Sequence, residues 1–145
     1  MAVTPNSILA LDVGARRVGV AVATVQARLP RPLITLIQDD TFFGALESII
    51  EVEGVRAVVV GFPRGMQGQH TAQTDAIEAF VAQLKQHVPL PIHMQDEALT
   101  SKHAEAELQA RGRAYDKGDI DALAATYILD DFLKEHPNIA QEVTS

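Results

Sequence analysis

ILALDVGARRVGVAVA, residues 8–23, is the stretch of sequence that decides the fold of this chain. An almost uninterrupted apolar run leads to Asp12, which is the pattern of a strand covered on both faces of a sheet. Residues 14–17 predict a turn, and the valine-rich run after them predicts a second strand that returns as a hairpin. An acid that closes a buried run needs a counter-charge, because an unpaired charge beside a core is costly. We therefore expect a metal ion at Asp12.

The composition is that of one globular domain. The chain has 145 residues, of which 47% are hydrophobic, and this length suits a single core. We predict one domain over residues 1–137 and a frayed tail over residues 138–145. No apolar run is long enough to span a bilayer, and the first residues lack the pattern of a secretory signal. We therefore expect a cytoplasmic protein that does not enter a membrane.

Cysteine content and charge limit the chemistry. The chain has no cysteine, which excludes disulfides, thiolate metal sites and cysteine nucleophiles. The five histidines form no convincing ligand pair, so a metal is expected on carboxylate oxygens. The formal net charge of −7 argues against a broad electrostatic grip on nucleic acid, although local basic patches can exist on an acidic protein.

Helical and strand patterns alternate after the hairpin. Periodicity and turn residues predict strands at residues 7–13, 18–23, 33–37, 55–61 and 92–95, and helices near residues 42–50, 71–88, 100–112 and 120–132. The order is βββαβαβα with a final helix, which is an α/β fold around a five-stranded mixed sheet. Right-handed crossovers favour placing the fourth strand between the first and the fifth, so the expected strand order is 3-2-1-4-5.

This topology brings acidic residues to one edge of the sheet. Strands one, four and five should be parallel and end together, with Asp12 and Glu97 at that edge. Their backbones would be about 10 Å apart, since neighbouring strands lie about 4.8 Å apart. Two carboxylates across that gap can share a pair of Mg²⁺ or Mn²⁺ ions. Asp121, at the start of the last helix, is the best-placed third carboxylate, and Asp119 is its competitor.

Basic residues near this edge are candidates for phosphate contacts. The turn after Asp12 contains Arg16 and Arg17, and Lys117 precedes Asp121 by one helical turn. The loop at residues 62–69 contains Arg64 and two glycines before a helix, so its backbone amides can bind a phosphate. It is not a P-loop, because no G-K-[ST] follows. Ordinary surface charges and a plain connecting loop are the alternative interpretations.

Four motifs together resemble the YqgF/RuvX family: LALDVGARRVGVAVA (9–23), VVVGFPRGMQG (58–68), QDEALTS (95–101) and DIDALAATYIL (119–129). Members of that family are described as pre-16S ribosomal RNA nucleases and as Holliday junction resolvases with a ribonuclease H-like fold. The resemblance implies that Asp12, Glu97 and Asp121 are an acidic triad that holds two Mg²⁺ or Mn²⁺ ions. It also implies hydrolysis of phosphodiester bonds in structured nucleic acid, either 5′-end processing of pre-16S rRNA in ribosome biogenesis or cleavage of branched DNA.

The sequence departs from the family pattern at two places. The family glutamate is commonly followed by arginine and the loop often reads close to L-N-M-D-G, whereas this chain has Ala98 and the loop RGMQG at residues 64–68. Ala98 and the acidic net charge favour one alternative, a catalytically weak nucleic-acid-binding factor for ribosome maturation. A second alternative is an ATP-using relative of the actin and sugar-kinase fold, but such proteins need two domains. The oligomeric state, the choice between RNA and DNA, and endo- or exonucleolytic cleavage are left open.

Overall fold

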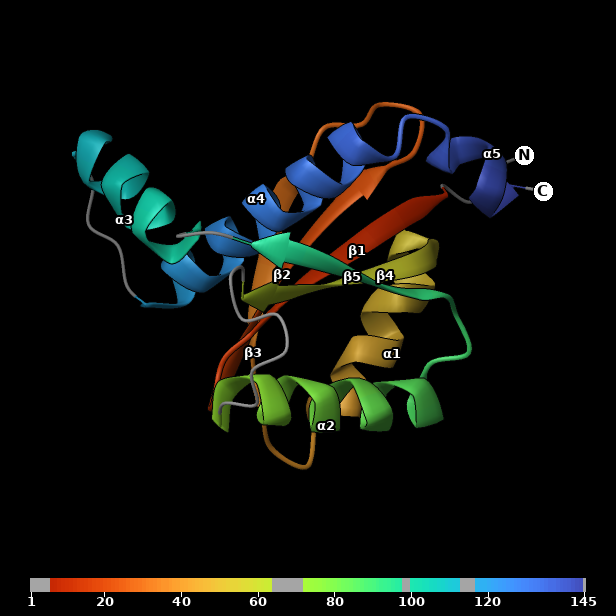
Figure 1. Cartoon of the computed structure of the whole chain (residues 1–145), viewed down its shortest axis with the longest axis horizontal. Helices are drawn as coiled ribbons and strands as arrows, with labels where there is room; N and C mark the ends of the chain where they lie inside the picture. Colours follow the sequence, from red (N-terminus) through yellow and green to blue (C-terminus); the bar gives the residue numbers. More distant parts are fainter. Residues whose placement is uncertain (1–5, 64–71, 98–99, 113–116, 145) are drawn as a thin grey trace.

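The computed structural model of this chain describes residues 6–63, 72–97, 100–112 and 117–144 (Figure 1). The strands in these ranges are β1 (Ser7–Val13), β2 (Arg17–Thr24), β3 (Arg31–Ile37), β4 (Val55–Pro63) and β5 (Ile92–Glu97). The helices are α1 (Phe42–Glu53), α2 (Ala72–His87), α3 (Thr100–Ala110), α4 (Lys117–Glu135) and α5 (Ile139–Thr144). No helix in the described part of the chain has both the length and the apolar character that a membrane span requires.

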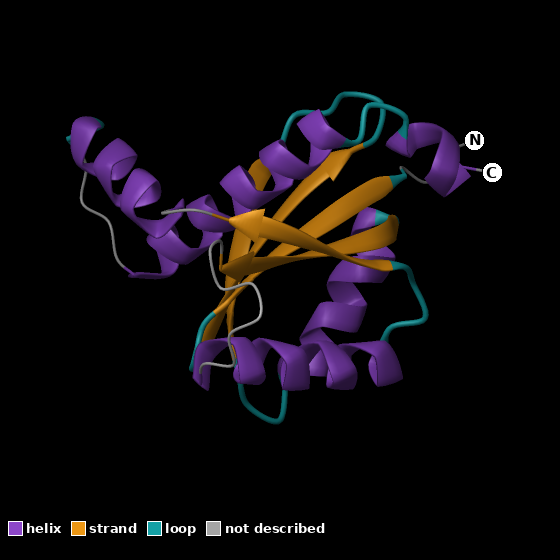
Figure 2. Ribbon diagram, in the orientation of Figure 1, coloured by secondary structure: helices purple, strands orange, loops and turns teal. Residues whose placement is uncertain are grey.

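The strands form one mixed sheet in the order β3-β2-β1-β4-β5, which confirms the order expected from the sequence. β1 is antiparallel to β2 and β2 is antiparallel to β3, while β1, β4 and β5 are parallel. Helices α1 and α2 lie on one face of the sheet, and α4 lies across the other face (Figure 2). Helix α3 extends away from the sheet and packs on α4.

Side-chain size differs between the two faces of the central strands. On the α1/α2 side, β1 contributes Leu9 and Leu11, and β2 contributes valines to a large apolar cluster. On the α4 side, β2 presents Gly19, Ala21 and Ala23 instead. Because these residues are small, α4 can lie close to the sheet and still bury its own large side chains, among them Phe132. The sheet thus holds α4 tightly along β1 and β2.

The end of the chain differs from the predicted frayed tail at residues 138–145. Residues 139–144 form helix α5, and Ile139 is only 1% exposed. Its side chain packs in the apolar cluster of the α4 side, which contains Phe132 and Leu133. The burial of this one apolar side chain gives the segment a docking point that its short, polar sequence does not reveal.

Candidate active site

Asp12 lies in a row of residues that crosses three strands. It is paired with Gly19 on β2, and Gly19 is paired with Thr35 on β3. Cross-strand partners share one face of a sheet, and so do every second residues of a strand. Asp12 therefore lies on the same face as Ile8 and Ala10, which pack on the α4 side. The half-buried carboxylate of Asp12 therefore belongs to the α4 face, at the carboxyl end of β1.

The first turns of α4 are held against this row. A Cβ atom at Gly19 would overlap the carbonyl oxygen of Asp121 and lie 2.8 Å from the backbone nitrogen of Ala122. The hydroxyl of Thr35 donates a hydrogen bond to the carbonyl oxygen of Gly118 at 2.6 Å. The backbone of Asp121 therefore lies directly on the strand position opposite Asp12, and only glycine allows this approach.

Asp121 is paired with an arginine that the sequence assigned to nucleic-acid binding. The Nε atom of Arg17 donates to Oδ2 of Asp121 at 2.7 Å, and the two side chains are 35% and 21% exposed. Arg17 begins β2 two residues before Gly19, so it lies on the same face as Asp12. Arg16 is exposed in the turn before it. The structure therefore gives the two neighbouring arginines different environments and pairs Arg17 with Asp121.

Asp119 and Asp121 have different environments on α4. Successive helical residues are rotated by about 100°, so the two side chains point roughly 200° apart around the helix axis. Asp121 is half-buried and paired with Arg17, whereas Asp119 is exposed. This difference favours Asp121 over its competitor as the acid that faces the sheet.

Glu97 is the last residue of β5 and is in register with Pro63 at the end of β4. Leu11 on β1 is level with Val60 on β4, and Val60 is level with Met94 on β5, so Asp12 and Glu97 end the two strands that flank β4, at the same edge of the sheet. For Glu97 and Lys117, the structure describes the backbone and not the side chain. Arg64 and nearly all of the predicted phosphate loop lie outside the described residues.

The donor set at this edge suits a hard cation. Asp12 and Asp121 offer only carboxylate oxygens, which are the ligands that Mg²⁺ and Mn²⁺ prefer. Among the described residues, no three His, Cys, Asp or Glu side chains form a group that could hold a metal ion. The third predicted ligand is Glu97. The two acids whose side chains the structure describes, Asp12 and Asp121, therefore have the ligand atoms that suit the predicted cation.

Three contributors to the site were not identified from the sequence. Gly19 and Thr35 anchor α4, and Gln95 anchors β5, because its buried side chain donates a hydrogen bond to Glu135 of α4. Gln95 stands two residues before Glu97 and is 5% exposed. Nothing local distinguishes Gln95 from the other polar residues of β5, or Gly19 from other strand glycines.

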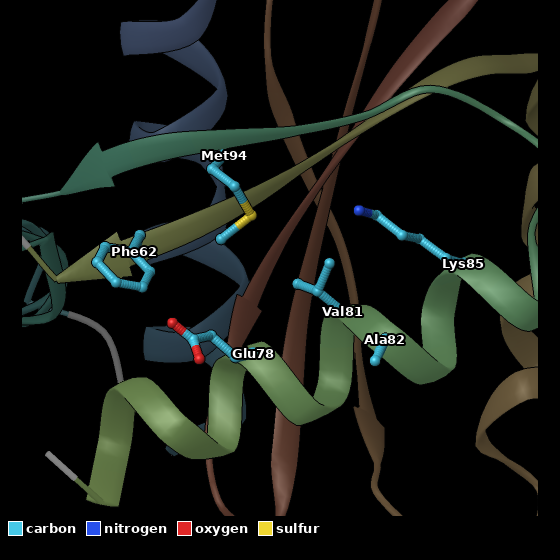
Figure 3. A pocket seen from close by; sticks show the side chains of 6 residues that line it. All are labelled: Phe62, Glu78, Val81, Ala82, Lys85 and Met94. Atoms are coloured by element: carbon cyan, nitrogen blue, oxygen red, sulfur yellow. The ribbon is translucent and has the colours of Figure 1, made fainter. Parts of the chain in front are cut away.

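A cavity of about 490 Å³ lies on the opposite side of the sheet (Figure 3). It lies between α2 and the strands β4 and β5, and its lining residues are Phe62, Glu78, Val81, Ala82, Lys85 and Met94. Neither Asp12 nor Asp121 is among the described residues that line it. The candidate site is therefore the open edge beside Asp12 and Asp121 and not this cavity.

Comparisons with known proteins agree with the fold and the motifs. The family model described as "RuvX: Holliday junction resolvase" matches residues 6–135. A relative from Chloroflexus aggregans with the name "Putative pre-16S rRNA nuclease" is 41% identical over 137 residues, which is 92% of this chain and 96% of the relative. A relative of the same name from Koribacter versatilis is 36% identical and covers 88% of this chain and 86% of its own length.

Solved structures show the same fold at low sequence identity. Thermus thermophilus RuvC in complex with a Holliday junction substrate matches with a TM-score of 0.54 and 15% identity, over 91% of this chain and 96% of RuvC. A second solved structure of Thermus thermophilus RuvC matches with a TM-score of 0.52 and 16% identity, over 90% of this chain and 96% of that chain. The sheet order, the helices on both faces and these matches confirm the ribonuclease H-like fold, and the chain belongs to the RuvX family.

Proposed function

We propose that this protein is a metal-dependent nuclease that hydrolyses phosphodiester bonds in structured nucleic acid, with the 5′ end of pre-16S rRNA as its favoured substrate. The observation that carries the proposal is the contact of α4 with Gly19, which brings Asp121 to the strand position opposite Asp12. Two acids 109 positions apart in the chain converge there on an open sheet edge, which is where α/β folds bind ligands.

Asp12, Glu97 and Asp121 would hold the cations in this proposal. Two bound Mg²⁺ or Mn²⁺ ions would supply an activated water and neutralise charge on the scissile phosphate. The contribution of the chain is to hold its carboxylates in place: β1 holds Asp12, and the contacts at Gly19 and Thr35 hold the first turns of α4. The residues proposed to bind the substrate backbone are Arg16, Arg17, Arg64 and Lys117.

RNA is the favoured substrate because the relatives with the higher sequence identity carry the pre-16S rRNA name. Their identities reach 41%, whereas RuvC, which was solved with a Holliday junction, is 15% identical. We therefore expect ribosomal RNA to be cut more efficiently than branched DNA, and we expect the protein to act in the cytoplasm. Ribosome biogenesis is the proposed process.

Cleavage assays test the proposal directly. A labelled RNA that spans the 5′ end of 16S rRNA and a four-way DNA junction are incubated with Mg²⁺, with Mn²⁺ or with EDTA. We expect cleavage of the RNA only with a divalent cation, and we expect Asp12→Asn to abolish cleavage without weakening binding. Undiminished cleavage in EDTA would contradict the metal-dependent mechanism.

The same assays separate the nuclease from the binding factor that Ala98 favours. A binding factor would shift the RNA in a gel-shift assay but would not cleave it with Mg²⁺ or with Mn²⁺. In that case the Asp12→Asn variant would support ribosome maturation in cells as well as the wild-type protein does. A nuclease is expected to cleave the RNA when a divalent cation is present. Its Asp12→Asn variant is expected to fail to support ribosome maturation.

A further inference from the structure

The carboxylate of Asp121 is paired with Arg17, and it is also a proposed ligand of the cation. These two interactions compete with each other. Asp121 is a proposed ligand for a cation, yet its Oδ2 atom already accepts a charge-assisted hydrogen bond from Nε of Arg17 at 2.7 Å. A divalent cation bound to the same carboxylate would repel the guanidinium across a few ångströms. Cation binding therefore weakens the hold of Asp121 on Arg17.

The structure allows Arg17 to leave Asp121 without moving the helix. The backbone of α4 is positioned by the contact at Gly19 and by the hydrogen bond from Thr35 to Gly118. Neither contact involves the Arg17 side chain. Both side chains are partly exposed, so water can solvate the two charged groups when they separate. The pairing can be exchanged while the acid stays in place.

A released guanidinium has a ready new partner. Arg17 is about one third exposed and lies on the sheet face of Asp12, beside the proposed position of the scissile phosphate. Planar guanidinium groups bind phosphate through two parallel hydrogen bonds, which a single Nε contact with Asp121 does not use. Phosphate is therefore the stronger partner once a cation has occupied the carboxylate.

We propose that Arg17 is an exchangeable counter-ion, which neutralises Asp121 while no cation is bound and binds the substrate phosphate once a cation has displaced it. The proposal rests on the proposed function, since it needs a cation and a phosphate at this edge. It predicts an order of events in which the cation binds before Arg17 engages the nucleic acid. Arg17 thereby makes tight substrate binding depend on a loaded metal site.

Cation affinity is the first test, measured by titration calorimetry with Mn²⁺ alone. Arg17→Gln removes the competitor for Asp121 and is expected to bind Mn²⁺ about fivefold tighter than the wild-type protein. Arg16→Gln is the matched control, because it removes the same charge from the adjacent, exposed residue. Its expected change is less than about twofold, since exposed charges are screened. Circular dichroism checks that each variant folds, and Arg17→Met, which keeps the aliphatic stem, is the second variant.

Coupling to nucleic acid is the second test, measured by fluorescence anisotropy with labelled pre-16S RNA. The titrations are done in EDTA and in Ca²⁺, after it has been checked that Ca²⁺ does not support cleavage. Arg17→Gln should lower RNA affinity about tenfold in Ca²⁺ and less than about twofold in EDTA, because Arg17 is held by Asp121 in the absence of cations. Arg16→Gln should lower RNA affinity equally in both buffers.

The two tests distinguish failure of this proposal from failure of the proposed function. Wild-type protein that binds Mn²⁺, with Arg17→Gln no tighter than Arg16→Gln, would overturn the counter-ion role and leave the metal site standing. Equal loss of RNA affinity by Arg17→Gln in both buffers would also overturn it. Wild-type protein that binds no Mn²⁺ would overturn the proposed function, and the counter-ion role with it.

Discussion

Gly19 on β2 lies directly against the backbone of Asp121 on α4, with no room for a side chain between strand and helix. This contact joins residues 102 positions apart and places the start of α4 over the partner of Asp12 in the β1–β2 ladder. Asp12 and Asp121 thus approach each other because one strand position has no Cβ. The geometry of the proposed site depends on this close packing.

Gly19→Ala is expected to destabilise the protein by about 2 kcal/mol or more, because the added methyl group overlaps rigid backbone atoms of α4. Urea denaturation measures the loss, and Mn²⁺ affinity should fall as α4 shifts. Gly44→Ala on α1 is the matched control, since nothing lies within 4 Å of its Cβ position. That variant should gain up to about 1 kcal/mol from helix propensity. A Gly19→Ala protein as stable as Gly44→Ala would contradict the packing argument.

Asp121→Asn is expected to lower the cleavage rate about 100-fold or more, because the amide is a poorer ligand for a divalent cation than the carboxylate. Asp119→Asn changes the same charge on the same turn of α4 but on its exposed side. It should keep the rate within about threefold of the wild-type value. Single-turnover cleavage of labelled RNA gives both rates. Equal losses in the two variants would show that charge, and not position, is what matters.

Tyr127 links α4 to α3, and its hydroxyl is expected to lose its proton at an unusually high pH. Its hydroxyl donates to Oε1 of Glu107 at 2.8 Å, and burial together with this contact raises the pKa of Tyr127 to about 12. The unfolded chain loses this proton near pH 10, so stability should fall as the pH rises from about 10 towards 12. Tyr127→Phe should remove that part of the pH dependence, measured by urea denaturation. An absorbance titration of tyrosine that is complete by pH 10.5 would contradict the raised pKa.

His93 is expected to make stability sensitive to mild acid. Its ring centroid lies 5.2 Å from that of Phe132 and 6.2 Å from that of His136. Burial lowers the pKa of His93 below its ordinary value of 6.5, the charge on His136 adds to the shift, and Glu142 opposes it. The unfolded chain therefore binds more protons, and stability should decrease as the pH falls below about 6.5.

The variant that tests this effect is His93→Gln, which removes the titrating ring. At pH 7.5 it should be less stable than the wild-type protein, because the contact with Phe132 is lost. The difference should shrink as the pH falls to 5, where the wild-type protein bears the cost of a protonated His93. Urea denaturation across this range provides the comparison. A difference that does not change with pH would contradict the lowered pKa.

Ile139→Ala should cost about 2 kcal/mol, because it empties a buried position that docks α5 on the α4 side of the sheet. Gln141→Ala, at an exposed position of the same short helix, should change stability by less than about 0.5 kcal/mol. Thermal and urea denaturation of both variants measure the contrast. Two indistinguishable variants would mean that the segment frays in solution, as the sequence suggested.

Local patterns in the sequence determined the strands, the hairpin at residues 8–23 and the acid that ends its first strand. The strand order also followed, because the handedness of crossovers leaves few ways to arrange alternating strands and helices. The parallel strands that carry Asp12 and Glu97 end at one edge for the same reason. These features depend on residues near one another in the chain or on general rules of topology.

Only the tertiary structure decided which side chains meet at that edge. Arg17 and Asp121 are 104 positions apart, and their contact depends on where α4 crosses the sheet. That crossing depends on the small side chains of β2 and on the hydrogen bond from Thr35, and Ile139 docks α5 in the same way. Such contacts arise from the fit of side-chain volumes between distant elements, and no local pattern of polar and apolar residues contains that information.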